Sequence, residues 1–178
     1  RTMRRRMVAG LVLILTACQV LPATERASER WIVTYFTAPG LYDVGVDADL
    51  VDLIGQAQES VDVAAYDLDL ESVAQALARA HEAGVQVRLV TDGSHVDEPM
   101  VTLLRQAGVP VVARPEEGWG LMHDKFVVVD RTWVWTGSWN MTENGTYRND
   151  NNAVLVASRY LAEDYTAEFE EMFSGLFG

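Results

Sequence analysis

Six residues between positions 123 and 140 have properties suited to chemistry on a phosphate. They lie in the run HDKFVVVDRTWVWTGSWN and are His123, Lys125, Asp130, Gly137, Ser138 and Asn140. A phosphodiester is an anion that repels nucleophiles, so a metal-free site that cleaves it needs a neutral nucleophile, cations on the phosphoryl oxygens and a proton donor. Imidazole can attack phosphorus, and an ammonium can neutralise the oxygens. These residue types therefore favour phosphodiester cleavage.

The segment that carries these residues is predicted to form a hairpin. Two residues apart on an extended strand, His123 and Lys125 project to the same face, so one phosphate can contact both. The apolar run 126–129 predicts a buried strand, 130–131 a turn and 133–136 the return strand. The glycine after this strand lets backbone approach a ligand closely, and the serine and asparagine beyond it supply short polar groups for phosphate oxygens.

The same run resembles the signature of the phospholipase D superfamily, which is His-x-Lys, four residues, Asp, six residues and Gly-Ser-x-Asn. The resemblance implies that a histidine attacks phosphorus to form a phosphohistidine, that a second histidine protonates the leaving group, and that water releases the product. His123, Lys125 and Asp130 are then the catalytic set, with Asp130 mainly structural, and Ser138 and Asn140 bind phosphate beside the lysine. No cofactor and no metal ligand is expected.

This path requires two copies of the motif, and the sequence contains one His-x-Lys. His81 is followed by Glu-Ala and is expected in solvent at a helix end, whereas His95 is followed by Val-Asp and lies in a loop that could reach the site. Two alternatives supply the missing copy. Either two chains form a homodimer that shares an active site, as in the small single-motif nucleases of the superfamily, or the natural protein continues past Gly178 into a second repeat.

One position departs from the family pattern. In single-motif relatives a carboxylate eleven residues beyond the motif asparagine orients the nucleophilic histidine, and Asn151 occupies that position here. An amide can accept a hydrogen bond from imidazole, but it stabilises imidazolium less than a carboxylate does. The expected consequence is either substitution by Asp150 or a less activated histidine.

The amino terminus resembles a bacterial export signal. Residues 4–6 are three arginines, residues 7–17 are largely apolar, and the sequence from Leu15 to Cys18 resembles a lipobox. Residues 1–18 are therefore expected to be a lipoprotein-type signal peptide, with the mature chain diacylated at Cys18 and anchored to a membrane of the cell envelope. A secreted protein cut by a plain signal peptidase is the alternative. The polar segment 19–30 is then a tether.

From residue 31 to residue 178, strand and helix patterns alternate. The predicted strands are 31–36, 61–66, 85–91, 109–114, 126–129, 133–136 and 153–157, and the predicted helices are 48–58, 72–83, 99–107 and 158–173. This alternation predicts one α/β sandwich domain with a mixed, largely parallel sheet flanked by helices.

The charge balance bears on the substrate. The chain has a net charge of −12, and the first 18 residues hold four arginines and no acidic residue, so the remainder has 10 basic and 26 acidic residues. This excess disfavours broad electrostatic binding to nucleic acid. The acidic positions Asp67, Asp69 and Glu71 are interpreted as a solvated loop in preference to a metal site. Trp139 is a candidate for cation–π contact with a quaternary amine.

Three functions from different classes remain open. The first is a membrane-tethered phosphodiesterase that hydrolyses phospholipid head groups, which the acidic balance and the expected anchor favour. The second is an envelope endonuclease that acts on DNA or RNA as a homodimer, which the resemblance to single-motif nucleases favours. The third is a non-catalytic surface module that binds phosphate, which the intact signature argues against.

Overall fold

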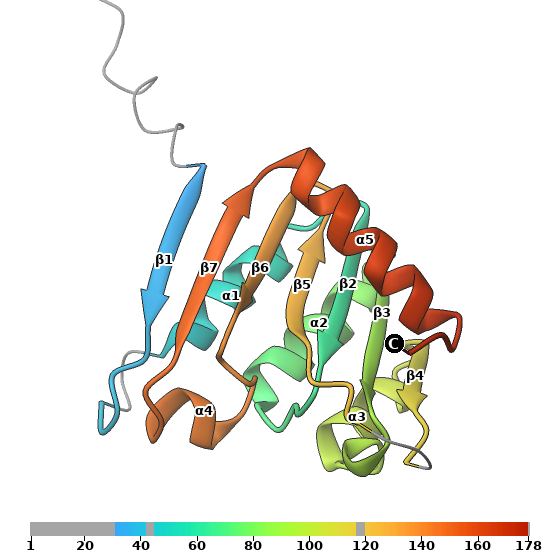
Figure 1. Ribbon diagram of the computed structural model, residues 1–178, viewed down its shortest axis with the longest axis horizontal. Coiled ribbons are helices and arrows are strands. Elements are labelled where there is room, and N and C mark those ends of the chain that lie inside the picture. The colour runs from blue at the N-terminus through green and yellow to red at the C-terminus, as the bar shows by residue number, and fades with distance from the viewer. Residues whose placement is uncertain (1–30, 42–44, 117–119, 178) are drawn as a thin grey trace, which may run out of the picture.

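The computed structural model describes residues 31–41, 45–116 and 120–177, and its centre is a seven-stranded sheet in the order β1-β7-β6-β5-β2-β3-β4 (Figure 1). The strands are β1 (Ile32–Phe36), β2 (Ser60–Ala65), β3 (Gln86–Asp92), β4 (Val111–Arg114), β5 (Lys125–Val129), β6 (Trp133–Gly137) and β7 (Asn152–Ala157). The helices are α1 (Val46–Gly55), α2 (Glu71–Glu82), α3 (Pro99–Gln106), α4 (Glu143–Tyr147) and α5 (Arg159–Phe173), and residues Gly93–His95 form a 3₁₀ turn.

The mixed sheet flanked by helices confirms the predicted fold class, but its strands are less parallel than expected. The pairs β2–β3 and β3–β4 are parallel, whereas β1–β7, β7–β6, β6–β5 and β5–β2 are antiparallel. Parallel neighbours require a crossover connection, usually a helix, and α2 and α3 supply it for the two parallel pairs. From β5 to β7 the chain reverses direction twice, through a tight turn after β5 and through the segment that contains α4 after β6, which produces antiparallel neighbours.

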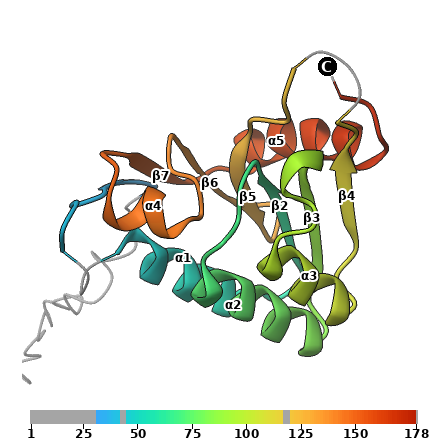
Figure 2. The same ribbon diagram turned by 90° about the horizontal axis from the view of Figure 1, so that it is seen from below.

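Helices cover both faces of the sheet. Seen along the sheet, α1, α2 and α3 lie on one side and α5 on the other (Figure 2). Apolar residues at helical spacing turn the first group toward the sheet, including Leu50 and Ile54 of α1 and Leu77 of α2, all fully buried. The strand between these layers, β2, is buried along its whole length. It is therefore a rigid support for the loop that follows it.

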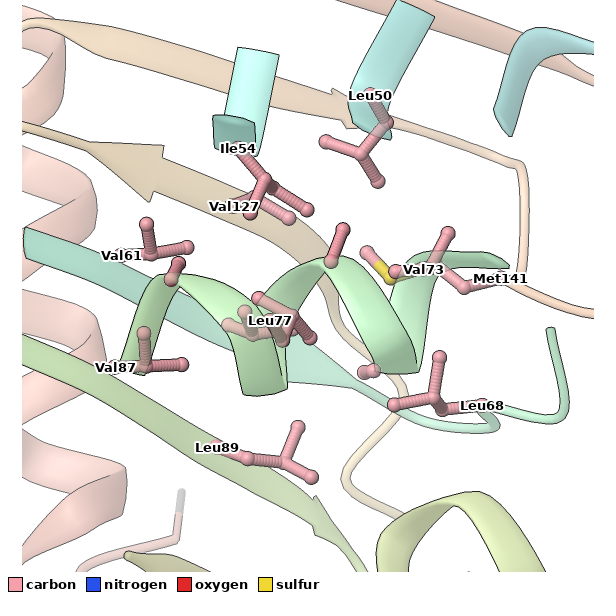
Figure 3. Packing of buried hydrophobic residues seen from close by; sticks show 14 of the residues in the cluster. Leu50, Ile54, Val61, Leu68, Val73, Leu77, Val87, Leu89, Val127 and Met141 are labelled. Carbon is pink, nitrogen blue, oxygen red and sulfur yellow. The ribbon is translucent and has the colours of Figure 1, made fainter. Parts of the chain in front are cut away.

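The larger of two hydrophobic clusters fills the space between the sheet and α1–α3. Val61 of β2, Leu89 of β3 and Val127 of β5 pack in it with Val73 and Leu77 of α2 (Figure 3). A smaller cluster between the sheet and α5 contains Phe126, Val134 and Phe169. The two clusters place consecutive residues of each central strand in opposite cores, as the alternation of side chains along a strand requires.

A charged cluster fixes α5 on its face of the sheet. Asp62 of β2 is fully buried and is paired with Arg88 of β3 at 2.7 Å, and Arg88 also contacts Glu170 of α5 at 2.8 Å. The Arg88 guanidinium lies 4.8 Å and 5.0 Å from the ring centres of Phe169 and Phe173. Hydrogen bonds to Asp62 raise the pKa of Arg88, with a further contribution from Glu170. The cation therefore holds a strand carboxylate and a helix carboxylate together.

Most predicted elements are observed within a few residues of their expected ends. Two were not predicted: the short helix α4 and the 3₁₀ turn at Gly93–His95. The predicted signal peptide, the tether and Cys18 lie outside the described residues. Within the described part of the chain, no helix has the length and apolar character needed to cross a bilayer.

Candidate active site

The candidate site lies at one edge of the sheet, where several loops meet. The loops after β2 and β3 leave this edge and the segment before β5 enters it, at the bottom of Figure 1. Because β2 and β3 are parallel neighbours, the residues that follow them are brought side by side. Ligand sites in open α/β sheets commonly form at the carboxyl ends of such strands.

His123 and Lys125 lie together as the sequence predicts. Lys125 is the first residue of β5, and its Nζ donates a hydrogen bond of 2.7 Å to the carbonyl oxygen of His123. Partial burial lowers the pKa of Lys125, and the carboxylates of Asp124 and Asp67 oppose that decrease. The His123 side chain is exposed to solvent. An accessible imidazole therefore stands beside a partly desolvated ammonium.

Tyr66, the residue after β2, organises these two side chains. Its ring meets the His123 ring edge to face with 4.7 Å between centroids, and the Lys125 Nζ lies 5.3 Å from its centroid. The backbone N–H of Tyr66 donates to the Asp124 carbonyl oxygen at 3.0 Å. The tyrosine thus restricts the orientation of the imidazole and of the ammonium at once.

A cleft of about 410 Å³ opens beside His123 and Lys125. The start of β5 and the end of β6 form one wall, with Thr136 and Gly137 from β6. Helix α5 forms the other wall with Asp164, Tyr165 and Glu168. Together with Asp124, two carboxylates of α5 make most of the charged surface of the cleft negative.

Gly137 ends β6 in a conformation that other residues rarely adopt, with φ of +154°. A side chain there would overlap the carbonyl group of Asn152, so the close approach of β6 to β7 requires glycine. The next residue, Ser138, is exposed; its hydroxyl donates to Asn151 Oδ1 at 3.0 Å and accepts from the Asn152 N–H at 3.1 Å. The hydroxyl is thereby held in place at the rim of the sheet.

The loop that carries Asn140 is tied to the loop after β2. Met141 accepts hydrogen bonds from the N–H groups of Asp69 and Leu70 at 3.2 Å and 3.1 Å, and the Asp69 carboxylate accepts from the Glu143 N–H at 2.7 Å. The side-chain oxygen of Asn140 is buried and has no hydrogen-bond partner among the described residues. These bonds hold the loop of Asn140 against the loop after β2, and Asp69 itself is exposed, in agreement with the interpretation of a solvated loop.

Neither residue proposed to orient the histidine contacts it. The Asn151 amide accepts from Ser138 and donates to the Gly145 carbonyl oxygen at 2.9 Å, so both ends of this side chain are engaged elsewhere. Asp150 is exposed, and its carboxylate makes no hydrogen bond with a described residue. In this structure Asn151 positions the motif serine.

Asp130 lies at the far end of β5 from Lys125, and its contacts fit the structural role expected for it. It accepts hydrogen bonds from the N–H groups of Gln58, Glu59 and Ser60 at 2.8–3.2 Å. Asp130 and Arg131 both have positive φ, as in the two-residue turns that close hairpins. Burial opposes ionisation of the carboxyl group, but the three N–H donors outweigh it and hold the pKa of Asp130 below its ordinary value.

Trp139 is also not available to a substrate. Its side chain is 2% exposed, packs against Trp135 and donates from Nε1 to Thr146 Oγ1 at 3.0 Å. A fully packed indole cannot contact a head group, so the cation–π hypothesis for Trp139 is wrong. Next to this indole, Ser138 is exposed, whereas the side-chain oxygen of Asn140 is buried.

His95 lies close to the site but in a second layer. Its ring meets the Tyr66 ring at 4.6 Å between centroids, on a ring that also contacts His123. Its Nδ1 lies 2.7 Å from Glu98 Oε1 and 3.7 Å from Asp67 Oδ1. Burial and the negative charge of Glu98 raise the pKa of Asp67 to about 6, although His95 acts in the opposite direction. His81, at the end of α2, is half-buried and lies away from this cluster.

Asp92 connects the loop of His95 to the segment of His123. This buried carboxylate accepts from the N–H and hydroxyl of Ser94 and from the Met122 N–H at 2.8 Å. Burial disfavours its ionised form, but these donors and the nearby Arg114 lower the pKa of Asp92 below its ordinary value. The residue before the candidate nucleophile is therefore fixed by a charge-assisted hydrogen bond.

Several residues of the site have no motif of their own in the sequence. Tyr66 follows a strand, and Asp164, Tyr165 and Glu168 belong to a helix more than twenty residues beyond the motif. The position of Tyr66 directly after a buried strand is a usable signal, since the carboxyl ends of parallel strands meet at one edge. The α5 residues give no such signal, because the approach of that helix depends on the packing of the whole face.

Comparison with known proteins identifies the family. The sequence model of the family described as "Cardiolipin synthase, PLD-like domain" matches residues 50–173. The chain is 36% identical over 174 residues to a mitochondrial cardiolipin hydrolase of Xenopus tropicalis, which covers 97% of this chain and 80% of that protein. It is 33% identical over 136 residues to a phospholipase D of Rickettsia prowazekii, which covers 75% of this chain and 63% of that protein.

Solved structures share the fold. The phospholipase D family member Nuc from Salmonella typhimurium superimposes with a TM-score of 0.71 at 23% identity, over 81% of this chain and 94% of that chain. NucT from Helicobacter pylori does so with a TM-score of 0.64 at 17% identity, over 81% and 97% of the two chains. The relatives named cardiolipin hydrolase and phospholipase D support a phosphodiester-hydrolysing enzyme, and the solved structures show its mixed α/β sandwich fold. The chain belongs to the phospholipase D superfamily.

Proposed function

We propose that this protein hydrolyses the head-group phosphodiester of phospholipids through a phosphohistidine formed on His123. The observation that carries the proposal is the pairing of an exposed imidazole and a partly desolvated ammonium at the mouth of one cleft. Relatives named cardiolipin hydrolase and phospholipase D support a lipid substrate. Lys125, Ser138 and Asn140 are the phosphate-binding groups in this proposal.

The reaction has two displacement steps at phosphorus. In the first, a nitrogen of His123 forms a bond to phosphorus while the bond to the head-group oxygen breaks, and a second histidine gives its proton to that oxygen. In the second, the neutral second histidine accepts a proton from water, the water oxygen bonds to phosphorus, and the bond to His123 breaks. Lys125 neutralises the phosphoryl oxygens in both steps. Phosphatidate and the head-group alcohol leave as products.

The second histidine comes, in this proposal, from another copy of the chain. His81 and His95 do not line the cleft, and the described part of the chain holds no further histidine besides His123. A two-fold axis beside His123 would place the imidazole of His123 from the second copy opposite it, as an isologous interface requires. The proposed enzyme is therefore a homodimer with one shared active site.

The charge of the cleft favours a lipid over a nucleic acid. Three carboxylates, those of Asp124, Asp164 and Glu168, line the cleft together with the single ammonium of Lys125. A nucleic acid carries a phosphate at every nucleotide, and the phosphates next to the scissile one would approach these carboxylates. A phospholipid carries its charge at the head group alone, so it can place its phosphate at Lys125 with less repulsion.

The lipid anchor at Cys18 remains a proposal that rests on the sequence from Leu15 to Cys18. An acylated chain with a short tether would stay at a membrane surface of the cell envelope, where its proposed substrate is present.

The test uses the purified full-length chain in EDTA, offered cardiolipin vesicles, phosphatidylcholine vesicles and supercoiled plasmid in parallel. We expect phosphatidate to be released from the phospholipid vesicles, together with the glycerol-linked phosphatidyl product in the case of cardiolipin. The plasmid should not be nicked. Substitution His123→Ala is expected to lower the rate by at least about 10³-fold, because it removes the nucleophile. Mass spectrometry of a rapidly quenched reaction should find the phosphoryl group on His123 of the wild-type chain.

A matched control is His81→Ala, which removes a histidine that lies away from the cleft and should keep full activity. Both variants should retain the wild-type melting temperature within experimental error. Nicking of plasmid without lipid hydrolysis would replace the lipase proposal by the nuclease alternative. Full activity of the His123→Ala chain would remove this residue from the reaction.

A further inference from the structure

Three potential metal ligands lie close together near Tyr66, on two loops at the site edge of the sheet. Asp67 follows β2, and His95 and Glu98 flank the segment between β3 and α3. One ligand atom from each residue lies within 4.8 Å of the others, and His95 Nδ1 is 2.7 Å from Glu98 Oε1 and 3.7 Å from Asp67 Oδ1. Ligands around a tetrahedral ion with bonds of about 2.0–2.2 Å lie about 3.3–3.6 Å apart. A small adjustment of these side chains therefore creates a metal-binding geometry.

The cluster contains a feature that an ion would explain. Asp67 Oδ1 is enclosed by protein and has no hydrogen-bond partner among the described residues, although the Asp67 side chain as a whole is 26% exposed. This oxygen points toward His95 Nδ1 at 3.7 Å, too far for a hydrogen bond. Glu98 brings a second negative charge to the same place. The two carboxylates repel each other, and a cation between them would remove that repulsion and give Asp67 Oδ1 a partner.

The chemistry of the donors indicates the class of ion. An imidazole nitrogen with two carboxylate oxygens is a ligand set preferred by Zn²⁺, Mn²⁺ and related transition metals, whereas Mg²⁺ and Ca²⁺ prefer oxygen alone. All three side chains are partly exposed, so an ion and its water ligands can reach them. Three protein ligands leave a tetrahedral ion one position for water.

We propose that Asp67, His95 and Glu98 bind a divalent transition-metal ion, with Zn²⁺ as the favoured occupant. The ion lies beside Tyr66, and none of its three proposed ligands lines the cleft. It takes no part in the phosphodiester reaction. The ion joins the loop after β2 to the segment after β3. It thereby stabilises the position of the Tyr66 ring, which contacts His95 and His123.

Calorimetric titration of the full-length chain with ZnCl₂, after removal of metal by EDTA and of EDTA by dialysis, tests the proposal. We expect saturable binding of one ion and a rise in melting temperature when ZnCl₂ is present. The substitutions His95→Gln and Glu98→Gln each remove one ligand. Each is expected to weaken binding by at least about 100-fold, since loss of outer-shell partners alone costs 10–100-fold.

Two control variants show whether the bound ion sits at this cluster. Asp97→Asn changes a carboxylate in the same segment whose side chain is 97% exposed, and it should leave zinc affinity unchanged. His123→Ala should also bind zinc with unchanged affinity. If zinc were bound at the cleft instead, this substitution would abolish the binding. The melting temperatures of all variants without zinc show whether each one folds.

Three outcomes would overturn the proposal. They are the absence of saturable zinc binding, zinc binding that survives His95→Gln, and binding of MgCl₂ as tight as that of ZnCl₂. Activity in EDTA does not bear on this site, because the proposed hydrolysis needs no metal. A failed lipid assay and a failed zinc titration are therefore distinguishable results.

Discussion

Single residues at the site show how a motif can be retained while the contacts around it change. Asn151 stands where relatives are expected to carry a carboxylate that orients the histidine, and its amide instead bridges Ser138 and the Gly145 carbonyl. The orientation of His123 depends on the ring of Tyr66. An aromatic contact restricts rotation without changing the charge of the imidazole as a carboxylate would.

Asp130 provides a prediction at this scale. Substitution Asp130→Asn replaces an acceptor of three N–H groups by an amide whose NH₂ faces one of those donors, so we expect a loss of about 1–3 kcal/mol in the free energy of unfolding. The rate of hydrolysis should not change, because Asp130 lies at the other end of β5 from Lys125. Denaturant unfolding and the activity assay measure the two effects, with Asp150→Asn as the exposed control.

The same residue predicts a pH dependence with a defined sign. The folded pKa of Asp130 is below its ordinary value of 3.8, so its contribution to stability is complete above that pH and is lost as the pH falls through the folded pKa. Unfolding measured between about pH 6 and pH 2 should therefore show a smaller acid destabilisation for Asp130→Asn than for the wild type. Equal pH profiles would contradict this role of the carboxylate.

The sequence predicts the residues of the motif better than their surroundings. His123 and Lys125 are local in sequence, and a strand of period two places them on one side regardless of the rest of the fold. Tyr66, Asp67 and His95 join the site only because β2 and β3 are parallel neighbours and β2 also pairs with β5. The burial of Trp139 could not be predicted, because an indole inside a motif can pack in the core or line a pocket. Which of the two occurs depends on the packing of the surrounding residues.

At the scale of elements, helix α5 closes the cleft and is fixed by one cation. Arg88 joins the buried Asp62 of β2 to Glu170 of α5, and two aromatic rings of the helix stack on its guanidinium. The same helix carries Asp164 and Glu168 to the cleft. Its attachment therefore sets the width and the charge of the substrate path.

The substitution Arg88→Met tests this attachment. It leaves the Asp62 carboxylate buried without a partner, so we expect a loss of about 3–5 kcal/mol in the free energy of unfolding. Arg105→Met is the matched control, because Arg105 is exposed and lies 4.0 Å from the exposed Asp97, and it should cost at most about 1 kcal/mol. Urea denaturation of both variants gives the comparison. The double variant Asp62→Leu with Arg88→Met should recover much of the loss, and failure to do so would locate the effect elsewhere.

Elements are predictable where the hydrophobic period is long and clear, and are missed where it is short. Helix α4 has five residues and a glycine in its centre, and a polar residue caps it, so it has no apolar stripe to detect. The direction of the strands is harder to predict than their existence. Periodicity indicates that a segment is a strand. Which strands become its neighbours, and in which direction, depends on how the connections run in the complete sheet.

At the scale of the whole molecule, the proposed shared site predicts a quadratic loss of activity on mixing. Co-refolding wild-type and His123→Ala chains in equal amounts gives mixed dimers that contain one nucleophile and lack the second histidine. If these are inactive, about one quarter of the wild-type activity remains, whereas independent active sites leave about one half. Sedimentation at the assay concentration should show the dimer. A monomer that turns over at the full rate would contradict the shared site.

The order of strands in the sheet also constrains how the chain can acquire its structure. The first strand pairs at the sheet edge with the last one, since Ile32 lies opposite Val156. A ribosome must therefore synthesise nearly the entire domain before the amino-terminal strand finds its neighbour, and closing so long a loop is slow. Until then β1 remains an unpaired segment with exposed aromatic residues at both ends, Trp31 and Phe36, and it is the part of the nascent chain most open to chaperones and to aggregation.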